Sequence, residues 1–486
     1  MKMQFLKATL FLIAITVSWS CGEKEKTPAP AAGLKAEAGA DQDVIPNNPV
    51  ALDGSASTGE ATKTFGWKLL KKPALSQVNF GAASQEKFSF TPDIVGYYEI
   101  ELTVADKAQQ STDKLTVKAE YTEPIILDKS ITADTRLFDR FIDAVKPDYL
   151  VTKDILVSAA LSIDRGVNIS FERDKGISID ERGAVLSLGS DEQRISFTGL
   201  QAQRGFWAGI RLFSPGSANT FEFTDIQFAG SKIAFTNTKA GLALFGNNKA
   251  QVALKDCKFH QNGGFGLYVQ NGSVLRQFAR NSFSGQAEAG LLIDAYNASA
   301  LDSKSSFSGT NGRDVVEISS SDIKDIQNVV WPAFEDGTPY RLLGNMAIET
   351  GWTLSPGVVL EAARDAMISV NRNGYLSAKG TATKKVAFKG ATGNNANWRG
   401  IIFYSNSNQN FLENAEINGA GSSTIVSGQK AAVTAYGKGA KLTIVNSQIS
   451  QSGGHAIMYT SDADINNNAE AANTFSGISQ KNLFKL

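Results

Sequence analysis

The feature that most constrains the fold of this chain is a long internal repeat. Trp207-Ala208-Gly209-Ile210 matches Trp398-Arg399-Gly400-Ile401 at an offset of 191 residues (398 − 207). Farther along, Phe283-Ser284-Gly285 matches Phe475-Ser476-Gly477 at an offset of 192 residues (475 − 283). Spacing that is kept over such a length indicates one sequence unit duplicated in tandem. We assign copy one to residues 121–335 and copy two to residues 336–486.

A shorter period runs inside the unit. Leu267 and Leu291 are 24 residues apart (291 − 267), and Phe283 and Phe307 keep the same step (307 − 283). Short aliphatic strands that recur at this interval between Gly, Asn and Ser turns are the signature of a parallel β-helix. A β-propeller or a jelly roll is the alternative, but both need tight antiparallel hairpins, whose sequence signals are scarce here.

In a β-helix the side chains of each strand point alternately into the coil and out of it. Applied to three successive strands of each copy, this alternation predicts twelve residues of the core. They are Ile210, Leu212, Leu242, Leu244, Leu267 and Val269 in copy one, and Ile401, Phe403, Val433, Ala435, Ile457 and Tyr459 in copy two.

The same region resembles a family of bacterial cell-surface proteins that fold as right-handed β-helices. The resemblance is carried by Leu354-Ser355-Pro356-Gly357-Val358, by Gly374-Tyr375-Leu376-Ser377-Ala378-Lys379-Gly380 and by Trp398-Arg399-Gly400-Ile401-Ile402-Phe403. It implies a long right-handed parallel β-helix and a cell-surface location. It implies no particular activity, because most members of the family have no defined function.

The N-terminus has the features of an export signal. Lys2 supplies positive charge, and Leu10–Val17 is an apolar run too short to span a bilayer, so residues 1–20 are predicted to be a signal peptide. Cys21 follows, and the segment resembles the lipobox of bacterial lipoproteins, although Ser18 stands where that pattern commonly has Leu. The resemblance implies that Cys21 is lipidated; a secretory signal followed by a chance cysteine is the alternative.

Residues 21–33 are charged at first and then rich in Pro and Ala, with nothing to bury, so they are predicted to form a flexible tether. A cysteine followed by such a segment resembles surface lipoproteins of the Bacteroidetes type. The resemblance implies a protein held by a lipid anchor at the outer membrane or cell surface.

Residues 34–120 read as short strands divided by turns, among them Val50–Leu52, Phe65–Leu69 and Glu99–Val104. Strands of this length and spacing predict an immunoglobulin-like β-sandwich. The whole chain is therefore predicted to be all-β, with this sandwich followed by the long β-helix.

The sandwich resembles a polycystic-kidney-disease (PKD) domain. The resemblance is carried by the turn Asp53-Gly54-Ser55-Ala56-Ser57, by Trp67, by Phe90-Thr91-Pro92-Asp93 and by the strand that ends at Asp106. It implies a spacer or binding module. Some members of the family bind calcium near the Asp turn, but Asp53 and Asp106 are expected to cap turns instead.

Composition and motifs argue against several function classes. Lys plus Arg and Asp plus Glu both number 48, so no charge surplus points to nucleic acid. Asp225 and Asp256 form the best candidate acidic pair, but acidic residues beside turns commonly cap backbone N–H groups. No catalytic residue, metal site or cofactor is therefore predicted, and Cys257 is expected to be a small structural residue.

A binding surface is the better prospect. Alternation places six aromatic residues on the outward face, where a ring can stack on the apolar C–H face of a sugar. We predict a ligand site formed by Trp207, Phe213, Phe245, Trp398, Tyr404 and Tyr436. In the alternative interpretation, an insertion such as 214–220 covers these rings, or Trp207 supports a bend at Gly209.

These features predict a lipid-anchored cell-surface protein that binds a glycan or a partner protein along the β-helix, and they point away from an enzyme. A β-helical polysaccharide lyase or glycoside hydrolase is the first alternative, which a groove lined by acidic residues would favour. A purely architectural envelope protein, which would have no groove, is the second.

Overall fold

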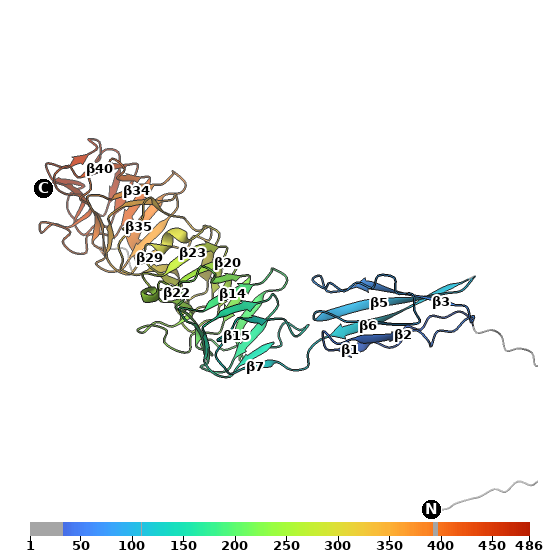
Figure 1. The fold of residues 1–486 in the computed structure, drawn as a ribbon. Coiled ribbons are helices and arrows are strands. Elements are labelled where there is room, and N and C mark those ends of the chain that lie inside the picture. The colour runs from blue at the N-terminus through green and yellow to red at the C-terminus, as the bar shows by residue number, and fades with distance from the viewer. Residues whose placement is uncertain (1–32, 108, 392–396) are drawn as a thin grey trace, which may run out of the picture. The chain divides into compact units, whose positions relative to one another are not determined.

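The computed structural model describes residues 33–107, 109–391 and 397–486, which form two compact units divided between Ala119 and Glu120 (Figure 1). The predicted signal peptide and Cys21 lie outside the described residues. The described elements are β-strands apart from two short 3-10 helices, η1 (Gly246–Asn248) and η2 (Asn297–Ala300). The prediction of an all-β chain is confirmed.

The first unit is a β-sandwich. One sheet has the order β1-β6-β5-β3 and the other pairs β2 with β4. Their bounds are β1 (Gln42–Val44), β2 (Val50–Asp53), β3 (Thr64–Lys71), β4 (Lys87–Phe90), β5 (Gly96–Ala105) and β6 (Gln110–Ala119). Inward residues of both sheets, among them Leu52, Trp67 and Ile100, form its core.

Asp53 and Asp106 cap turns of the sandwich, as the sequence predicted. The Asp53 carboxylate accepts a hydrogen bond of 2.9 Å from the Ser55 N–H, and Asp106 accepts one of 2.9 Å from the Gln109 N–H. The Lys87 ammonium lies 2.8 Å from Asp53 and holds the pKa of that carboxyl below its usual value.

The second unit is a parallel β-helix, with every strand pair between successive coils parallel. One sheet of thirteen strands, hereafter the long sheet, runs through both copies. Its strands are β10 (Ile155–Val157), β13 (Gly176–Ile179), β16 (Gly209–Leu212), β19 (Ala240–Leu244), β22 (Phe265–Val269), β25 (Ala289–Ile293), β27 (Arg313–Ile318), β29 (Tyr340–Leu342), β32 (Val359–Ala362), β35 (Val386–Gly390), β38 (Ala415–Asn418), β41 (Gln448–Ser450) and β44 (Thr474–Ser476).

Copy one has two further sheets. The eight-stranded sheet holds β7 (Ile125–Leu127), β9 (Tyr149–Val151), β12 (Asn168–Phe171), β15 (Ile195–Gly199), β18 (Thr224–Gln227), β21 (Lys258–His260), β24 (Ser282–Ser284) and β26 (Ser306–Gly309). A six-stranded sheet holds β8 (Thr135–Leu137), β11 (Ala160–Ile163), β14 (Ala184–Leu188), β17 (Thr220–Glu222), β20 (Gln251–Lys255) and β23 (Val274–Ala279).

Copy two also has two further sheets, each of six strands. The first holds β28 (Val329–Trp331), β31 (Gly351–Leu354), β34 (Tyr375–Lys379), β37 (Phe411–Glu413), β40 (Lys441–Val445) and β43 (Asp464–Ile465). The second holds β30 (Met346–Ile348), β33 (Met367–Val370), β36 (Gly400–Phe403), β39 (Ala431–Ala435), β42 (His455–Tyr459) and β45 (Leu483–Lys485).

The duplication holds strand by strand but with a turn of the coil. β16 of copy one lies in the long sheet, whereas its counterpart β36 lies in a six-stranded sheet. β15 lies in the eight-stranded sheet, whereas its counterpart β35 lies in the long sheet. The change occurs at β27, where Val316 pairs with Leu291 on one side and with Tyr340 on the other. Copy two is therefore turned about the coil axis by one sheet relative to copy one.

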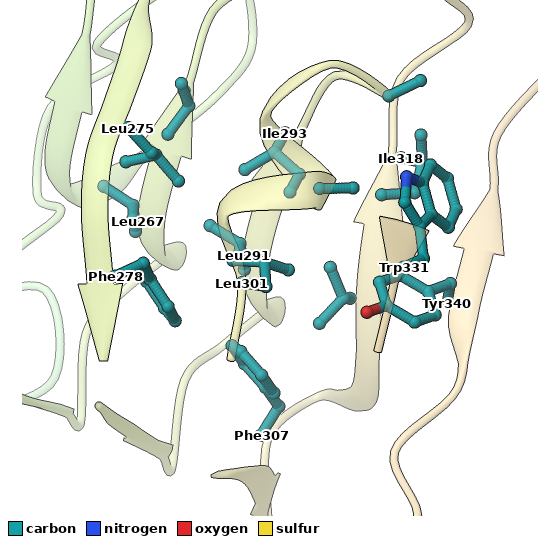
Figure 2. Packing of buried hydrophobic residues seen from close by; sticks show 14 of the residues in the cluster. Leu267, Leu275, Phe278, Leu291, Ile293, Leu301, Phe307, Ile318, Trp331 and Tyr340 are labelled. Carbon is teal, nitrogen blue, oxygen red and sulfur yellow. The ribbon is translucent and has the colours of Figure 1, made fainter. Parts of the chain in front are cut away.

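The interior of the coil is filled by the inward residues of each strand. Eleven of the twelve predicted core residues are buried in one continuous cluster, and the twelfth, Tyr459, is partly buried against it. Figure 2 shows this cluster where the copies meet, with Trp331 lying against Tyr340 at a centroid distance of 4.9 Å. Alternation within strands therefore predicted the core correctly.

The corners of the coil explain Cys257. Its thiol donates to the Phe221 carbonyl oxygen at 3.2 Å, and its counterpart Ser447 donates to the equivalent Leu412 carbonyl oxygen at 3.2 Å. Burial raises the pKa of the thiol to about 12, so the thiolate that nucleophilic chemistry needs is not formed near neutral pH. Cys257 is a structural residue, as predicted.

Candidate functional site

Four of the six predicted ligand residues come together as two equivalent pairs. Phe213 stacks on Phe245 with ring centroids 4.2 Å apart, at the outward ends of β16 and β19. Their counterparts Tyr404 and Tyr436, at the ends of β36 and β39, meet edge to face at 6.0 Å. We name the surface around the first pair face one and the surface around the second pair face two.

Face one contains two aromatic residues that the sequence analysis missed. Phe235 lies 6.3 Å from Tyr268 and 6.4 Å from Phe245, so four rings form one outward cluster. Phe235 belongs to the loop 231–239, which is 39% exposed at this residue and 52% exposed at Ile233. The alternation of Leu267-Tyr268-Val269 places Tyr268 outward and could have revealed it; the position of Phe235 depends on the path of a loop.

Face two is built in the same way. The loop 422–430 packs Ile425 over the buried outward side chains of Ile402 and Met458. Each loop closes as a short antiparallel bridge, Phe235 with Thr238 in face one and Val426 with Gln429 in face two. The segments that cover part of the rings are therefore 231–239 and 422–430, rather than the insertion 214–220 considered from the sequence.

The expectation that Trp207 and Trp398 share the outward face is wrong. Both are fully buried, and Trp207 stacks on Phe171 inside the coil at 4.0 Å. Each indole Nε1–H donates to a backbone carbonyl oxygen, that of Gln227 at 2.7 Å and that of Asn418 at 2.8 Å. The chain bends at Gly209, where φ is +105°, so the alternation within β16 does not extend back through the bend to Trp207.

The acidic pair considered for catalysis is held by arginines. Asp225 lies 2.7 Å from Arg194, and Arg280 donates two hydrogen bonds of 2.7 and 2.6 Å to Asp256. Asp256 has a φ of +55° and its counterpart Asn446 one of +53°, so both occupy the left-handed conformation that Asp and Asn tolerate at turns. Within the described ranges, no group of three or more His, Cys, Asp and Glu side chains could hold a metal ion.

A groove of about 880 Å³ lies along one corner of copy two, and we name it the corner groove. Its floor is formed by the outward residues Val359, Ala387 and Glu416 on adjacent strands β32, β35 and β38 of the long sheet. Its walls come from the loops 332–337, 355–357 and 382–385, together with Ser303. Sequence reasoning missed this groove, which lies within the usual size range of ligand sites, about 300–1,000 Å³.

The corresponding corner of copy one contains a buried acidic pair instead. Asp148 accepts backbone hydrogen bonds of 2.6 Å from both Arg140 and Asn168. Burial, together with the charge of Asp148, raises the pKa of Asp139 to about 7, and burial raises the pKa of Asp148 to about 6.

We expect this pair to make copy one less stable as pH rises from 5 to 8. A carboxyl whose pKa is raised by folding stabilises the fold fully below its unfolded pKa, about 4, and loses that contribution as pH rises through the folded value. The Asp139→Asn variant should therefore gain thermal stability over the wild type at pH 8 and much less at pH 5. Parallel melting-temperature profiles for the two proteins between pH 5 and 8 would contradict this assignment.

Comparison with known protein families supports the assignment of the first unit. Residues 38–118 match a family model that describes a PKD domain. The solution structure of the PKD domain from human KIAA0319 is 20% identical, with a TM-score of 0.16, and the match covers 20% of this chain and 90% of that one. For the solution structure of the PKD domain from the KIAA 1837 protein, the values are 27%, 0.17, 20% and 97%.

No curated protein matches this chain. The PKD domain indicates an extracellular module of the adhesion type. Among the described residues no helix is long and apolar enough to cross a membrane.

Proposed function

We propose that this protein is held at the cell surface by a lipid on Cys21 and binds glycans or partner proteins through its β-helix. The observation that carries the proposal is the recurrence of an outward aromatic pair in both copies, at Phe213 and Phe245 and at Tyr404 and Tyr436. Aromatic residues combine a large apolar area with few rotatable bonds, and Tyr adds a hydroxyl group, so such residues are enriched where proteins bind partners.

The anchor is supported by the order of features along the chain. An apolar signal-like run precedes Cys21, a tether follows it, and a PKD domain stands between the tether and the β-helix. Several acyl chains on one cysteine would hold the protein stably, whereas one chain alone binds a membrane only marginally. A PKD domain in this position would serve as a spacer between the membrane and the β-helix.

Hydrolysis of a polysaccharide is the second candidate function, because the corner groove contains two carboxylates, Glu335 and Glu416. A glycoside hydrolase needs two such groups beside the scissile bond. Glu416, however, lies 2.8 Å from the Lys385 ammonium, in the same arrangement as Asp225 with Arg194 in copy one. A shared structural ion pair favours binding over catalysis. The existence of a groove counts against a purely architectural role.

The experiment is to pass the soluble chain beginning at Gly22 over a panel of immobilised polysaccharides and to measure both retention and release of reducing ends. The double variants Phe213→Ala/Phe245→Ala and Tyr404→Ala/Tyr436→Ala should each weaken retention about tenfold, the loss expected for one contact of about 1.4 kcal/mol. Leu156→Ala, an outward residue of the long sheet that is 42% exposed, is the matched control.

Unchanged retention of both double variants would overturn the proposed role of the aromatic faces. Release of reducing ends that is abolished by Glu335→Gln or Glu416→Gln would identify the protein as a hydrolase instead. Retention of wild-type protein on membranes after a Cys21→Ser substitution would contradict the lipid anchor.

A further inference from the structure

The corner groove exists only because copy two has diverged from copy one at this corner. Eleven residues, 138–148, connect β8 to β9 in copy one, whereas eight residues, 332–339, connect β28 to β29 in copy two. The shorter connection leaves uncovered a row of outward positions that is covered in copy one.

The floor has changed together with the loop. Asn168 in copy one donates hydrogen bonds of 3.1 Å to the carbonyl oxygens of Ala144 and Val145, which ties the longer loop over the corner. Its counterpart in copy two is Val359, which cannot donate such bonds and lines the groove instead. Two independent differences, a shortened loop and a lost polar tie, therefore act together to open one site.

The polar groups on the walls are balanced in charge. Lys384 and Lys385 face Glu335 and Glu416, so the lining carries no net charge. The hydroxyl groups of Ser303, Ser355 and Thr383 add further donors and acceptors around the small apolar floor. No hydrogen bond or ion pair to another part of the described chain engages the Lys384 ammonium, whose aliphatic stem lies beside Gly357.

We infer that the corner groove binds a neutral oligosaccharide, an inference that rests on the proposed function and names the ligand class and the site. Charged side chains form strong hydrogen bonds to sugar hydroxyl groups as both donors and acceptors. A lining without net charge gives no advantage to an anionic chain. The narrow floor of Val359 and Ala387 accommodates the C–H face of a sugar ring, and its three strands span about 10 Å along the axis at the usual strand spacing.

The groove also lies on the same sheet as face one. From β22, which carries Tyr268, four steps of the long sheet lead to β32, a separation of about 19 Å at the usual strand spacing. The outward surface between them carries a row of paired charges, including Arg341 at 2.6 Å from Glu361. A sufficiently long oligosaccharide that follows the long sheet reaches both the groove and face one.

The test is isothermal titration of the folded soluble chain with neutral cello-, manno- and xylo-oligosaccharides of graded length, with oligogalacturonate as the anionic comparison. Ala387→Tyr fills the floor of the groove from a surface position and should weaken binding of the neutral ligand at least tenfold. Ser196→Tyr, at the equivalent position of copy one, should leave it unchanged. Lys384→Ala, paired with Gln193→Ala of copy one, makes the same comparison with small side chains, and melting curves verify the fold of every variant.

The outcomes separate this inference from the proposed function. Loss of binding in Ala387→Tyr and Lys384→Ala, with both copy-one controls intact, supports the groove. Wild-type affinity in these two variants overturns the groove, and if the aromatic double variants then lose binding the proposed function stands. Preference for oligogalacturonate overturns the neutral ligand class. Absence of binding to any glycan or surface protein overturns both proposals.

Discussion

Replacing Trp207 by alanine should lower the free energy of unfolding of the β-helix by about 3–5 kcal/mol, the usual cost of removing a fully buried large aromatic side chain. The ring stacks on Phe171 at 4.0 Å, and its Nε1–H donates to the Gln227 carbonyl oxygen at 2.7 Å. The variant leaves a cavity and an unpaired carbonyl oxygen in the core. Trp398→Ala should behave in the same way, because that indole is equally buried and donates to Asn418.

The measurement is the urea midpoint and slope of unfolding, followed by tryptophan fluorescence and circular dichroism. Phe213→Ala is the matched control, because this ring is only partly buried on the outward side, and its loss should be clearly smaller. Near-equal midpoints for Trp207→Ala and the wild type, together with lost glycan retention, would return Trp207 to the surface where the sequence pattern had placed it.

Substituting Gly209 by alanine should cost about 2–5 kcal/mol. A side chain at a positive φ costs about 1–2 kcal/mol, and forcing atoms into a filled space costs about 1–3 kcal/mol more. At Gly209, φ is +105°, and a Cβ would lie 2.6 Å from the Ala240 carbonyl oxygen. Gly400 has the equivalent geometry, with φ of +129° and a Cβ 2.6 Å from the Ala431 carbonyl oxygen.

Gly437 separates the two contributions to that cost. Its φ is +97°, but a Cβ there would meet nothing within 4 Å, so Gly437→Ala should lose only the conformational part. Chemical denaturation of the three alanine variants gives the comparison. Equal losses at Gly209 and Gly437 would show that close approach of the next strand does not constrain the bend.

The sequence predicted what depends on order within a single strand. Ile210 and Leu212 alternate inside β16, and both lie in the core. The same rule failed for Trp207 because a glycine bend separates it from the strand, and side-chain parity does not pass through a bend. The outward pairs Phe213 with Phe245 and Tyr404 with Tyr436 follow β16, β19, β36 and β39 directly, which is why alternation placed them correctly.

Other features depend on distances between strands that no local pattern encodes. The loop that carries Phe235 reaches face one only because of its path over the surface. The corner groove follows from the difference in length between the connections 138–148 and 332–339, which the repeat alignment could have exposed had the loops been compared as well as the matching residues.

The turn of copy two about the axis sets the valency of the molecule. Face one lies on the long sheet, whereas face two lies on the six-stranded sheet that holds β36 and β39. A single straight polymer laid along the coil can touch one of these faces but not both. If both faces bind, their simultaneous use requires two chains that approach from different directions, so each molecule would act as a cross-link in a network, with an avidity set by the spacing of those chains.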